Sequence, residues 1–295
     1  MKNLPASLII SVSALLMLVA FLFVGPFIYS SPEHEDGVMI MNDGSIRTAP
    51  FPPGEDFVLG SDAAGNDLFG QLMSAGQGTL LLVLMIVAVR FILAVPLAYF
   101  GRKQKGIFHQ GIHLLNQLFS FMPLLIGMIF FMTIPFVISS EYRMLFVFIG
   151  IVLFELGRTA VTVQESFHQV RQKSFMETPT MIGSSRWTVW RKYYWRHIRS
   201  SLIVLFCLDI SKMMMLLGQL GFFAMFISMT FAVNDLGEPI AINAFETWPT
   251  LLSNARTHIP NEMWVIFWPS LAIAVTSLIF FSIGNALKNM QQTTS

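Results

Sequence analysis

Residues 3–32 contain no Asp, Glu, Lys or Arg, and their apolar core runs from about residue 4 to residue 29. A helix needs about 20 predominantly apolar residues to cross the hydrocarbon core of a bilayer, so this stretch is long enough to do so. It is too long for the apolar region of a signal peptide, and no clear small-residue cleavage site follows it. We therefore expect residues 1–30 to form a retained N-terminal transmembrane helix.

Five more segments meet the same criterion in a chain that is 54% hydrophobic and only 12% charged. They cover about residues 78–100, 112–138, 144–161, 202–230 and 263–287. The sequence therefore predicts an all-α integral membrane protein with six transmembrane helices. An even number of crossings places both termini on the same side of the membrane.

Basic residues gather on the side that holds the termini. That side has thirteen Lys or Arg, Arg158 among them, against two acids, whereas the opposite loops hold thirteen acids and three Arg, namely Arg47, Arg143 and Arg256. Because short loops rich in Lys and Arg stay in the cytoplasm during insertion, we expect the termini, the tail 289–295 and the segment 158–199 to be cytoplasmic. Residues 31–77 then form an extracytoplasmic loop.

The cytoplasmic segment 174–199 reads "SFMETPTMIGSSRWTVWRKYYWRHIR". Ser174 and Glu177 have the spacing of a capping box, which starts a helix. Gly183 can end that helix in a left-handed conformation, and the serines that follow it can cap a second helix from about Arg186. Two interpretations remain open: an interfacial loop whose aromatic and basic residues attract lipid, or a docking element for a cytoplasmic partner.

Several motifs occur in a fixed order around this segment. They are "LGSDAAGNDLF" (59–69), "VPLAYFG" (95–101), "ETPTMIG" (177–183), "ETWPTLLSNAR" (246–256) and "WVIFWPSLAIAVTSLIFFSIGNALK" (264–288). The third of these, with the basic run after it, resembles the EAA loop of binding-protein-dependent ABC importer permeases. The others resemble the LGTD-x-x-GRD segment, the end of helix two, the last outer loop and the last helix of the dipeptide/oligopeptide/nickel branch.

This resemblance covers roughly residues 59–288 and implies the type I, MetI-like permease fold. Residues 78–288 are then a five-helix core with an EAA-like coupling loop at about 165–199. The chain departs from the pattern at four positions: Thr178 and Pro179 replace the alanines of EAA, Asn66 replaces the Arg of GRD, and Pro249 follows Trp248 where the family has Gly. Since proline disturbs the turn that precedes it, we expect the docking helix to begin near Thr178.

The resemblance also implies partners and a division of labour. Gly60 and Gly65 have the spacing of a phosphate-binding loop, but Asn66 and Asp67 follow instead of Lys and Ser or Thr, so the chain is not expected to be an enzyme or to bind a cofactor. ATP and Mg²⁺ are expected on one or two separate ABC ATPase subunits. A homologous second permease and an extracytoplasmic substrate-binding protein are the other expected partners, in the cytoplasmic membrane of a prokaryote, and no nucleic acid is expected.

In such a permease the ATPase receives the coupling loop in a surface cleft. Glu177 and Gly183 would set the shape of the loop, while Met181, Ile182 and Arg186 would contact the ATPase. No catalytic arrangement is recognised in the chain, and no metal site is expected.

Charged residues also occur inside the predicted helices. A charge at the centre of a bilayer costs at least about 2.5–3.5 kcal/mol, so Arg90 needs an acid or a water-filled cavity. Asp209 and Lys212 are three residues apart and can pair with each other, as can Glu155 and Arg158. Either these charges neutralise one another within the bundle, or they line a hydrated path in which Asp209 or Arg90 contacts the termini of a peptide or another zwitterion.

The sequence thus predicts the permease subunit of an ATP-driven importer of dipeptides, oligopeptides or a related small solute. One alternative is a nickel or metal-chelate permease of the same branch. The other, from a different class, is a stand-alone secondary transporter or channel that uses its own intramembrane charges.

Overall fold

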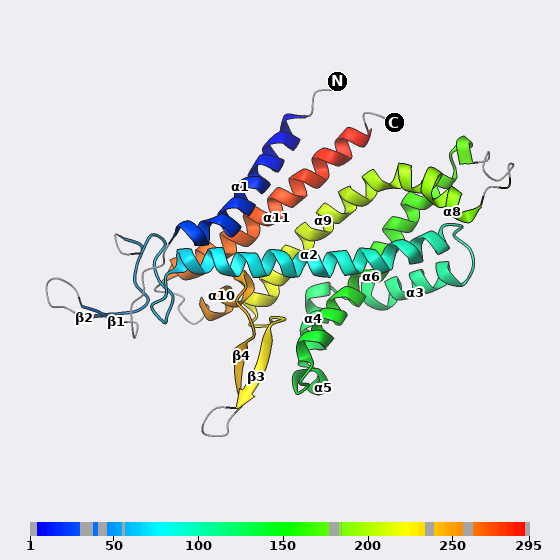
Figure 1. Ribbon diagram of the computed structural model, residues 1–295. Coiled ribbons are helices and arrows are strands. Elements are labelled where there is room, and N and C mark those ends of the chain that lie inside the picture. Colours follow the sequence, from blue (N-terminus) through cyan, green and yellow to red (C-terminus); the bar gives the residue numbers. More distant parts are fainter. Residues whose placement is uncertain are drawn as a thin grey trace.

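A computed structural model describes residues 5–29, 38–40, 46–54, 57–176, 183, 185–233, 239–255 and 262–292. In these ranges the chain is a bundle of long helices, with two short β-hairpins beyond one end of the bundle (Figure 1). The expected all-α membrane protein is confirmed, with the hairpins as an addition outside the helical bundle.

Long apolar helices make up most of the described chain. Five are long and apolar enough to cross a membrane: α1 (Ala6–Ile28), α2 (Leu68–Gly101), α6 (Arg143–Arg171), α9 (Trp195–Phe222) with the π-helix Val189–Tyr194 before it, and α11 (Met263–Gln292). The sixth span exists only if α3 (Ile107–Ser120) and α4 (Leu124–Thr133), which are bent by 81° at their junction, count as one.

The bend between α3 and α4 corrects the expectation of one continuous helix over residues 112–138. Pro123 caps the start of α4 with an extended backbone, and a proline disfavours helical geometry in the residue before it. A second proline, Pro135, begins the short helix α5 (Pro135–Ile138). The apolar run is therefore long enough to span a bilayer, but its prolines divide it.

Among the other helix boundaries, three differ from the expected ones by eight to ten residues. Helix α2 begins at Leu68 instead of residue 78, because the Asp67 carboxylate accepts a hydrogen bond from the Gly70 N–H at 2.8 Å and caps the helix. Helix α6 continues past residue 161 to Arg171. Helix α9 ends at Phe222 instead of residue 230, and Ala224 beyond it has a left-handed φ of 58° that stops the helix.

Both hairpins are antiparallel. Strands β1 (Val38–Ile40) and β2 (Ile46–Thr48) belong to the loop between α1 and α2. Strands β3 (Met229–Val233) and β4 (Pro239–Asn243) follow α9, and Met229 pairs with Asn243. The buried Arg143 donates to the carbonyls of Phe226 and Met229 at 3.2 and 3.0 Å, so it holds the base of the β3–β4 hairpin. The remaining short elements are α8 (Arg186–Thr188), α10 (Trp248–Ala255) and the 3₁₀-helix Ser174–Met176.

Antiparallel packing gives the bundle two ends. Leu8, near the start of α1, packs with Ile283 and Ala286 near the end of α11. Leu22, near the other end of α1, lies so close to Gly76 of α2 that a Cβ at Gly76 would overlap it. We call the end with the start of α1 and the end of α11 the termini end, and the end with β1–β4 the hairpin end (Figure 1). The main apolar core lies between them, chiefly among α2, α6 and α9.

Candidate functional site

Five charged side chains meet halfway along the bundle, on three helices. Arg90 comes from α2, Glu155 and Arg158 come from α6, and Asp209 and Lys212 come from α9. At 1.5 Å per residue, Arg90 lies about 16 Å from the end of α2 at Gly101, and Lys212 about 15 Å from the end of α9 at Phe222. The cluster therefore lies well inside the span of these helices, away from both ends of the bundle.

Arg90 and Asp209 form a buried ion pair between α2 and α9. Their Nη1 and Oδ2 atoms are 2.8 Å apart, and the Arg90 side chain is only 1% exposed. The other terminal nitrogen of Arg90 donates to the Ile151 carbonyl of α6 at 3.1 Å and lies 3.7 Å from the Met213 sulfur. One guanidinium thus links α2, α6 and α9. The predicted need of Arg90 for an acid is confirmed.

The expected pairing of Asp209 with Lys212 is wrong. Asp209 turns toward Arg90 on the neighbouring helix, whose guanidinium also gains a backbone carbonyl. A planar guanidinium with several donors satisfies a buried carboxylate better than a single ammonium does. Across the described ranges, no ion pair includes Lys212.

Glu155 and Arg158 pair as their spacing predicts, with 2.7 Å between Oε1 and Nη1. The Glu155 side chain is 8% exposed and that of Arg158 is 49% exposed. Because α6 continues to Arg171, Arg158 lies within the helix and not in the basic loop where its sequence position suggested. The count of Lys and Arg on the side that holds the termini therefore loses one residue, and the excess of basic residues on that side remains.

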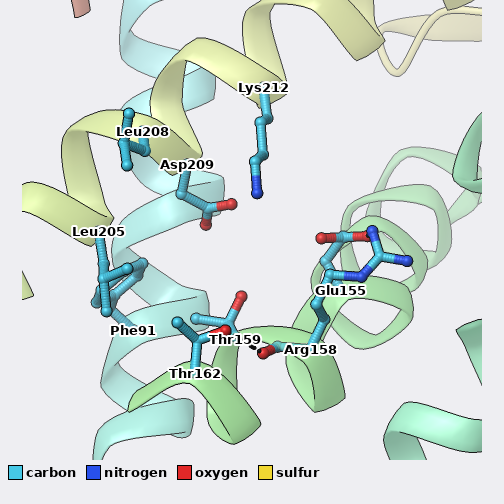
Figure 2. Close-up of a pocket in the computed structure, with 9 residues that line it drawn as sticks. All are labelled: Phe91, Glu155, Arg158, Thr159, Thr162, Leu205, Leu208, Asp209 and Lys212. Carbon is cyan, nitrogen blue, oxygen red and sulfur yellow. Dashed lines mark hydrogen bonds and ion pairs between the residues drawn. The ribbon is translucent and has the colours of Figure 1, made fainter. Parts of the chain in front are cut away.

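A pocket of about 70 Å³ opens between α6 and α9 beside these charges (Figure 2). It is lined by Phe91, Glu155, Arg158, Thr159, Thr162, Leu205, Leu208, Asp209 and Lys212. Figure 2 shows the Lys212 ammonium and the Asp209 and Glu155 carboxylates turned toward the same space. One water needs about 10–15 Å³, so the pocket has room for several waters. A polar cavity at this depth satisfies the condition for a charged side chain inside a membrane span.

Aromatic rings connect the same three helices near the termini end. Tyr99 of α2, Phe167 of α6, and Trp190 and Tyr194 of the π-helix have ring centroids 4.6–5.7 Å apart in five pairs. Arg102 covers this aromatic cluster, with its guanidinium carbon 3.9 Å from the centre of the Tyr99 ring. The interpretation of residues 174–199 as an interfacial loop with aromatic residues, or as a docking element, did not predict this cluster, whose members lie on three separate helices.

The segment expected to dock a partner is only partly described. Gly183 has a φ of 64°, the left-handed conformation predicted for it, and no atom lies within 4 Å of where its Cβ would be. The Ser185 hydroxyl accepts from the Thr188 N–H at 3.3 Å, so the predicted serine cap of the second helix is present. Glu177, Met181, Ile182 and the side chain of Arg186 lie outside the described residues, and their roles stay predictions.

Metal-binding clusters are absent from the described part of the chain, since no three His, Cys, Asp or Glu side chains there are arranged to hold an ion. The His109 and His113 rings lie 4.4 Å apart, and His109 Nδ1 is 3.1 Å from the Gln164 amide nitrogen. His109 therefore helps to hold α3 against α6, and His113 packs beside it on α3.

Three curated relatives are permease proteins of bacterial transport systems, whereas no protein-family model matches the chain. The probable D,D-dipeptide transport system permease protein DdpC of Escherichia coli (strain K12) is 20% identical over 290 residues, covering 98% of this chain and 88% of DdpC. The nickel transport system permease protein NikC of the same strain is 24% identical over 231 residues, covering 78% and 76%. The glutathione transport system permease protein GsiD of Pectobacterium atrosepticum is 23% identical over 232 residues, covering 78% and 70%.

The chain is a homologue of the ABC permeases of the dipeptide/oligopeptide/nickel branch. The family resemblance of its ordered motifs is thereby confirmed. These relatives are transport permeases and not enzymes, and together with the apolar helices they support a multi-pass membrane protein.

In this permease homologue the motif "LGSDAAGNDLF" forms a compact turn before α2. The Asp62 carboxylate accepts hydrogen bonds from the N–H groups of Ala64 and Asn66 and from the amides of Asn66 and Gln71, at 2.6–3.1 Å. The Asn66 that replaces the family's Arg is thus held by the aspartate of its own turn.

Glu246 lies near this turn. Partial burial raises the pKa of Glu246 above its ordinary value, and the nearby Asp62 raises it further.

The start of α10 is attached to two other helices of the permease homologue. The Trp248 backbone N–H donates to the Thr79 hydroxyl at 2.8 Å, and the buried Trp248 indole donates to the Leu72 carbonyl at 2.9 Å, both on α2. Pro249 lies against Gly221 of α9, where a Cβ would overlap the Pro249 backbone. The proline that departs from the family's Trp-Gly pattern therefore packs against a glycine on the neighbouring helix.

Proposed function

We propose that this chain is the transmembrane permease subunit of an ATP-driven importer that moves small peptides, or a related small solute, across the cytoplasmic membrane of a prokaryote. Both termini and residues 165–199 face the cytoplasm. One or two separate ATPase subunits bind ATP and Mg²⁺ and drive the coupling loop. A homologous second permease and an extracytoplasmic substrate-binding protein complete the transporter.

The observation that carries this proposal is the match to a dipeptide transport permease over 98% of the chain. So long an alignment takes in the long helices and the segment 174–199 together. The acidic loop before α2 and the basic segment 174–199 then lie on opposite faces of the membrane, as the distribution of Lys and Arg favours.

The helices offer a direct route from the coupling loop to the pocket. From Arg186 the chain passes through α8 and the π-helix into α9 without leaving helical geometry. Asp209 lies fourteen residues beyond Trp195, which is about 21 Å along the axis of α9. A displacement at the start of α9 therefore reaches the charged pocket along one continuous helical segment. The aromatic cluster passes the same displacement to α2 and α6.

A nickel or metal-chelate permease of the same branch is the second candidate. It is favoured by NikC, which is 24% identical to this chain over 231 residues. Both candidates share the coupling route and differ only in the cargo. A stand-alone secondary transporter is the alternative that the first experiment tests.

That experiment is uptake by vesicles reconstituted with this chain and the subunits that co-purify with it. We expect uptake to require ATP on the side of the vesicle membrane where the ATPase subunits lie. We also expect vanadate to inhibit it. Mass spectrometry of the purified complex identifies the subunits and any small molecule retained. Uptake by the chain alone, without an ATPase, would contradict the proposal.

Gly183→Asp is the sharper test of the coupling loop. We expect this variant to insert normally and to lose at least about tenfold in ATP-driven uptake, because a side chain at a left-handed position alters the turn that faces the ATPase. Gly106→Asp is the matched control, since Gly106 also has a positive φ (89°) and open space around its Cβ, but precedes α3. Equal uptake by both variants would refute the docking assignment.

A further inference from the structure

Lys212 is the one cation of the central cluster that has no ion-pair partner within the described ranges. Arg90 is paired with Asp209, and Arg158 is paired with Glu155. Two of these cations, Arg158 and Lys212, line the pocket together with both carboxylates, and Arg90 pairs with Asp209 from behind the lining. The cluster as a whole therefore holds three cations and two carboxylates, and its surplus positive charge belongs to Lys212. An unpaired ammonium halfway along a spanning helix is costly, so its retention points to a ligand.

The geometry points to a carboxylate-binding subsite: we propose that the pocket between α6 and α9 receives an anionic group of the cargo on Lys212. Figure 2 shows the Lys212 ammonium turned into the space that Thr159 and Thr162 also line. The Thr162 hydroxyl already donates to the Arg158 carbonyl at 3.0 Å, which leaves Thr159 as the hydroxyl beside the anion. The half-exposed Arg158 supplies a second positive charge at the rim.

This subsite narrows the class of cargo. Both carboxylates of the lining are already paired with arginines, so the unpaired Lys212 sets the net charge of the cluster, which repels a bare metal cation and attracts a carboxylate. The cargo is therefore a solute with a free carboxylate, such as a peptide C-terminus or a carboxylate chelate of a metal, and not a hydrated metal ion. The inference rests on the proposed transport function, since it names the cargo group that the pocket holds.

Charged thiol reagents test this subsite in the full chain, together with its partner subunits in native membranes. The native Cys207 is first replaced by serine, and Thr162→Cys then places a thiol in the pocket. Two methanethiosulfonates of similar size, one carrying a sulfonate and one a trimethylammonium, are compared by their rates, each normalised to its rate with a free thiol. We expect the anionic reagent to be favoured.

Lys212→Met is then expected to lower the anion-to-cation rate ratio about tenfold, as the loss of one nearby charge in a partly hydrated site implies. Lys212→Arg should preserve the ratio. Leu153→Cys is the control for accessibility: Leu153 is 39% exposed on α6, and its nine-residue separation from Thr162 places it on the opposite face of the helix.

Three results would overturn the proposal: a ratio that favours the cation, a ratio unchanged by Lys212→Met, or a Thr162→Cys rate no higher than that of Leu153→Cys. The second result is the one expected if an acid of another subunit neutralises Lys212. Because labelling needs no ATP turnover, such a failure is distinct from a failure of the Gly183→Asp test, which concerns the coupling loop alone.

Discussion

The charged pocket and the aromatic cluster join the same three helices, α2, α6 and α9, by opposite means. Midway along the bundle the helices are linked by the Arg90 guanidinium, which pairs with Asp209 and donates to the Ile151 carbonyl beside a polar cavity. Near the termini end they are linked by the rings of Tyr99, Phe167, Trp190 and Tyr194, with no ion pair among the residues described there. Polar contacts leave room for water and solute, whereas the rings of the aromatic cluster, which meet mostly edge to face, fill the space between helices.

This difference shows how one helical bundle can contain a proposed cargo site and also transmit movement of the coupling loop to that site. The aromatic cluster keeps the helices in contact close to the coupling loop, so that they move together. Beside the Arg90 contacts that join the helices, the pocket leaves a small polar space between α6 and α9, where we propose that the cargo passes. Substitutions in the two regions should therefore have different consequences, and the following predictions are ordered by the size of the expected effect.

Breaking the Arg90–Asp209 pair should have the largest effect on stability. Arg90→Leu leaves a buried carboxylate without its partner, and we expect a loss of about 3–5 kcal/mol in the free energy of unfolding. Unfolding of the detergent-purified complex, followed by heat or denaturant, measures it. Arg158→Leu is the comparison: it also leaves a carboxylate that is only 8% exposed, but the lost guanidinium is 49% exposed and its pair lies within α6 alone, so we expect a smaller loss than for Arg90→Leu. The reverse order would show that the buried pair does not hold the helices.

Removing the buried ring of Phe167 should come next. Phe167→Ala empties the centre of the aromatic cluster, so we expect a loss of about 3 kcal/mol. We also expect lower uptake per ATP hydrolysed, because α6 would no longer follow the π-helix. Phe108→Ala is the control, since Phe108 is 47% exposed and its ring stacks only on Phe100. If Phe167→Ala is expressed normally and its uptake per ATP hydrolysed is unchanged, the aromatic cluster does not transmit movement from the coupling loop.

The smallest effect concerns Glu246 at the hairpin end, outside both regions. Its pKa in the folded chain is raised above the ordinary value, by partial burial first and by Asp62 second. The folded state therefore favours the protonated form, and stability should fall as the pH rises from the unfolded pKa, about 4.3, through the higher folded value. The melting temperature measured across that range should show the slope, and Glu246→Gln should flatten it. A melting temperature that rises with pH over the same range, and no longer does so in Glu246→Gln, would contradict the raised pKa of Glu246.

Local patterns predicted several features of the fold and site correctly. The i, i+3 spacing gave the Glu155–Arg158 pair, and the depth of Arg90 in an apolar segment required an acid or water. Gly183 and Ser185 behave as the rules for helix ends and caps predict. Each of these features depends on residues close in sequence or on burial of one helix.

Features that depend on residues far apart in the chain were not predicted from the sequence. Nothing in residues 195–222 indicates that Asp209 prefers Arg90 to the nearer Lys212, because the competing guanidinium comes from 119 positions away. The aromatic cluster likewise draws its rings from three helices. The bend at Pro123 had a local signal, which the length of the apolar run outweighed in the prediction.

The fastening of Trp248 and Pro249 constrains how this bundle can move. Two hydrogen bonds attach Trp248 to α2, and Pro249 fits against Gly221 on α9, so one short segment bridges both helices at the hairpin end. Those helix ends cannot spread apart while the bridge is intact. A push delivered at the opposite end, as we propose for residues 174–199, would then swing α2 and α9 about this corner as a pivot, with the widest excursion at the termini end.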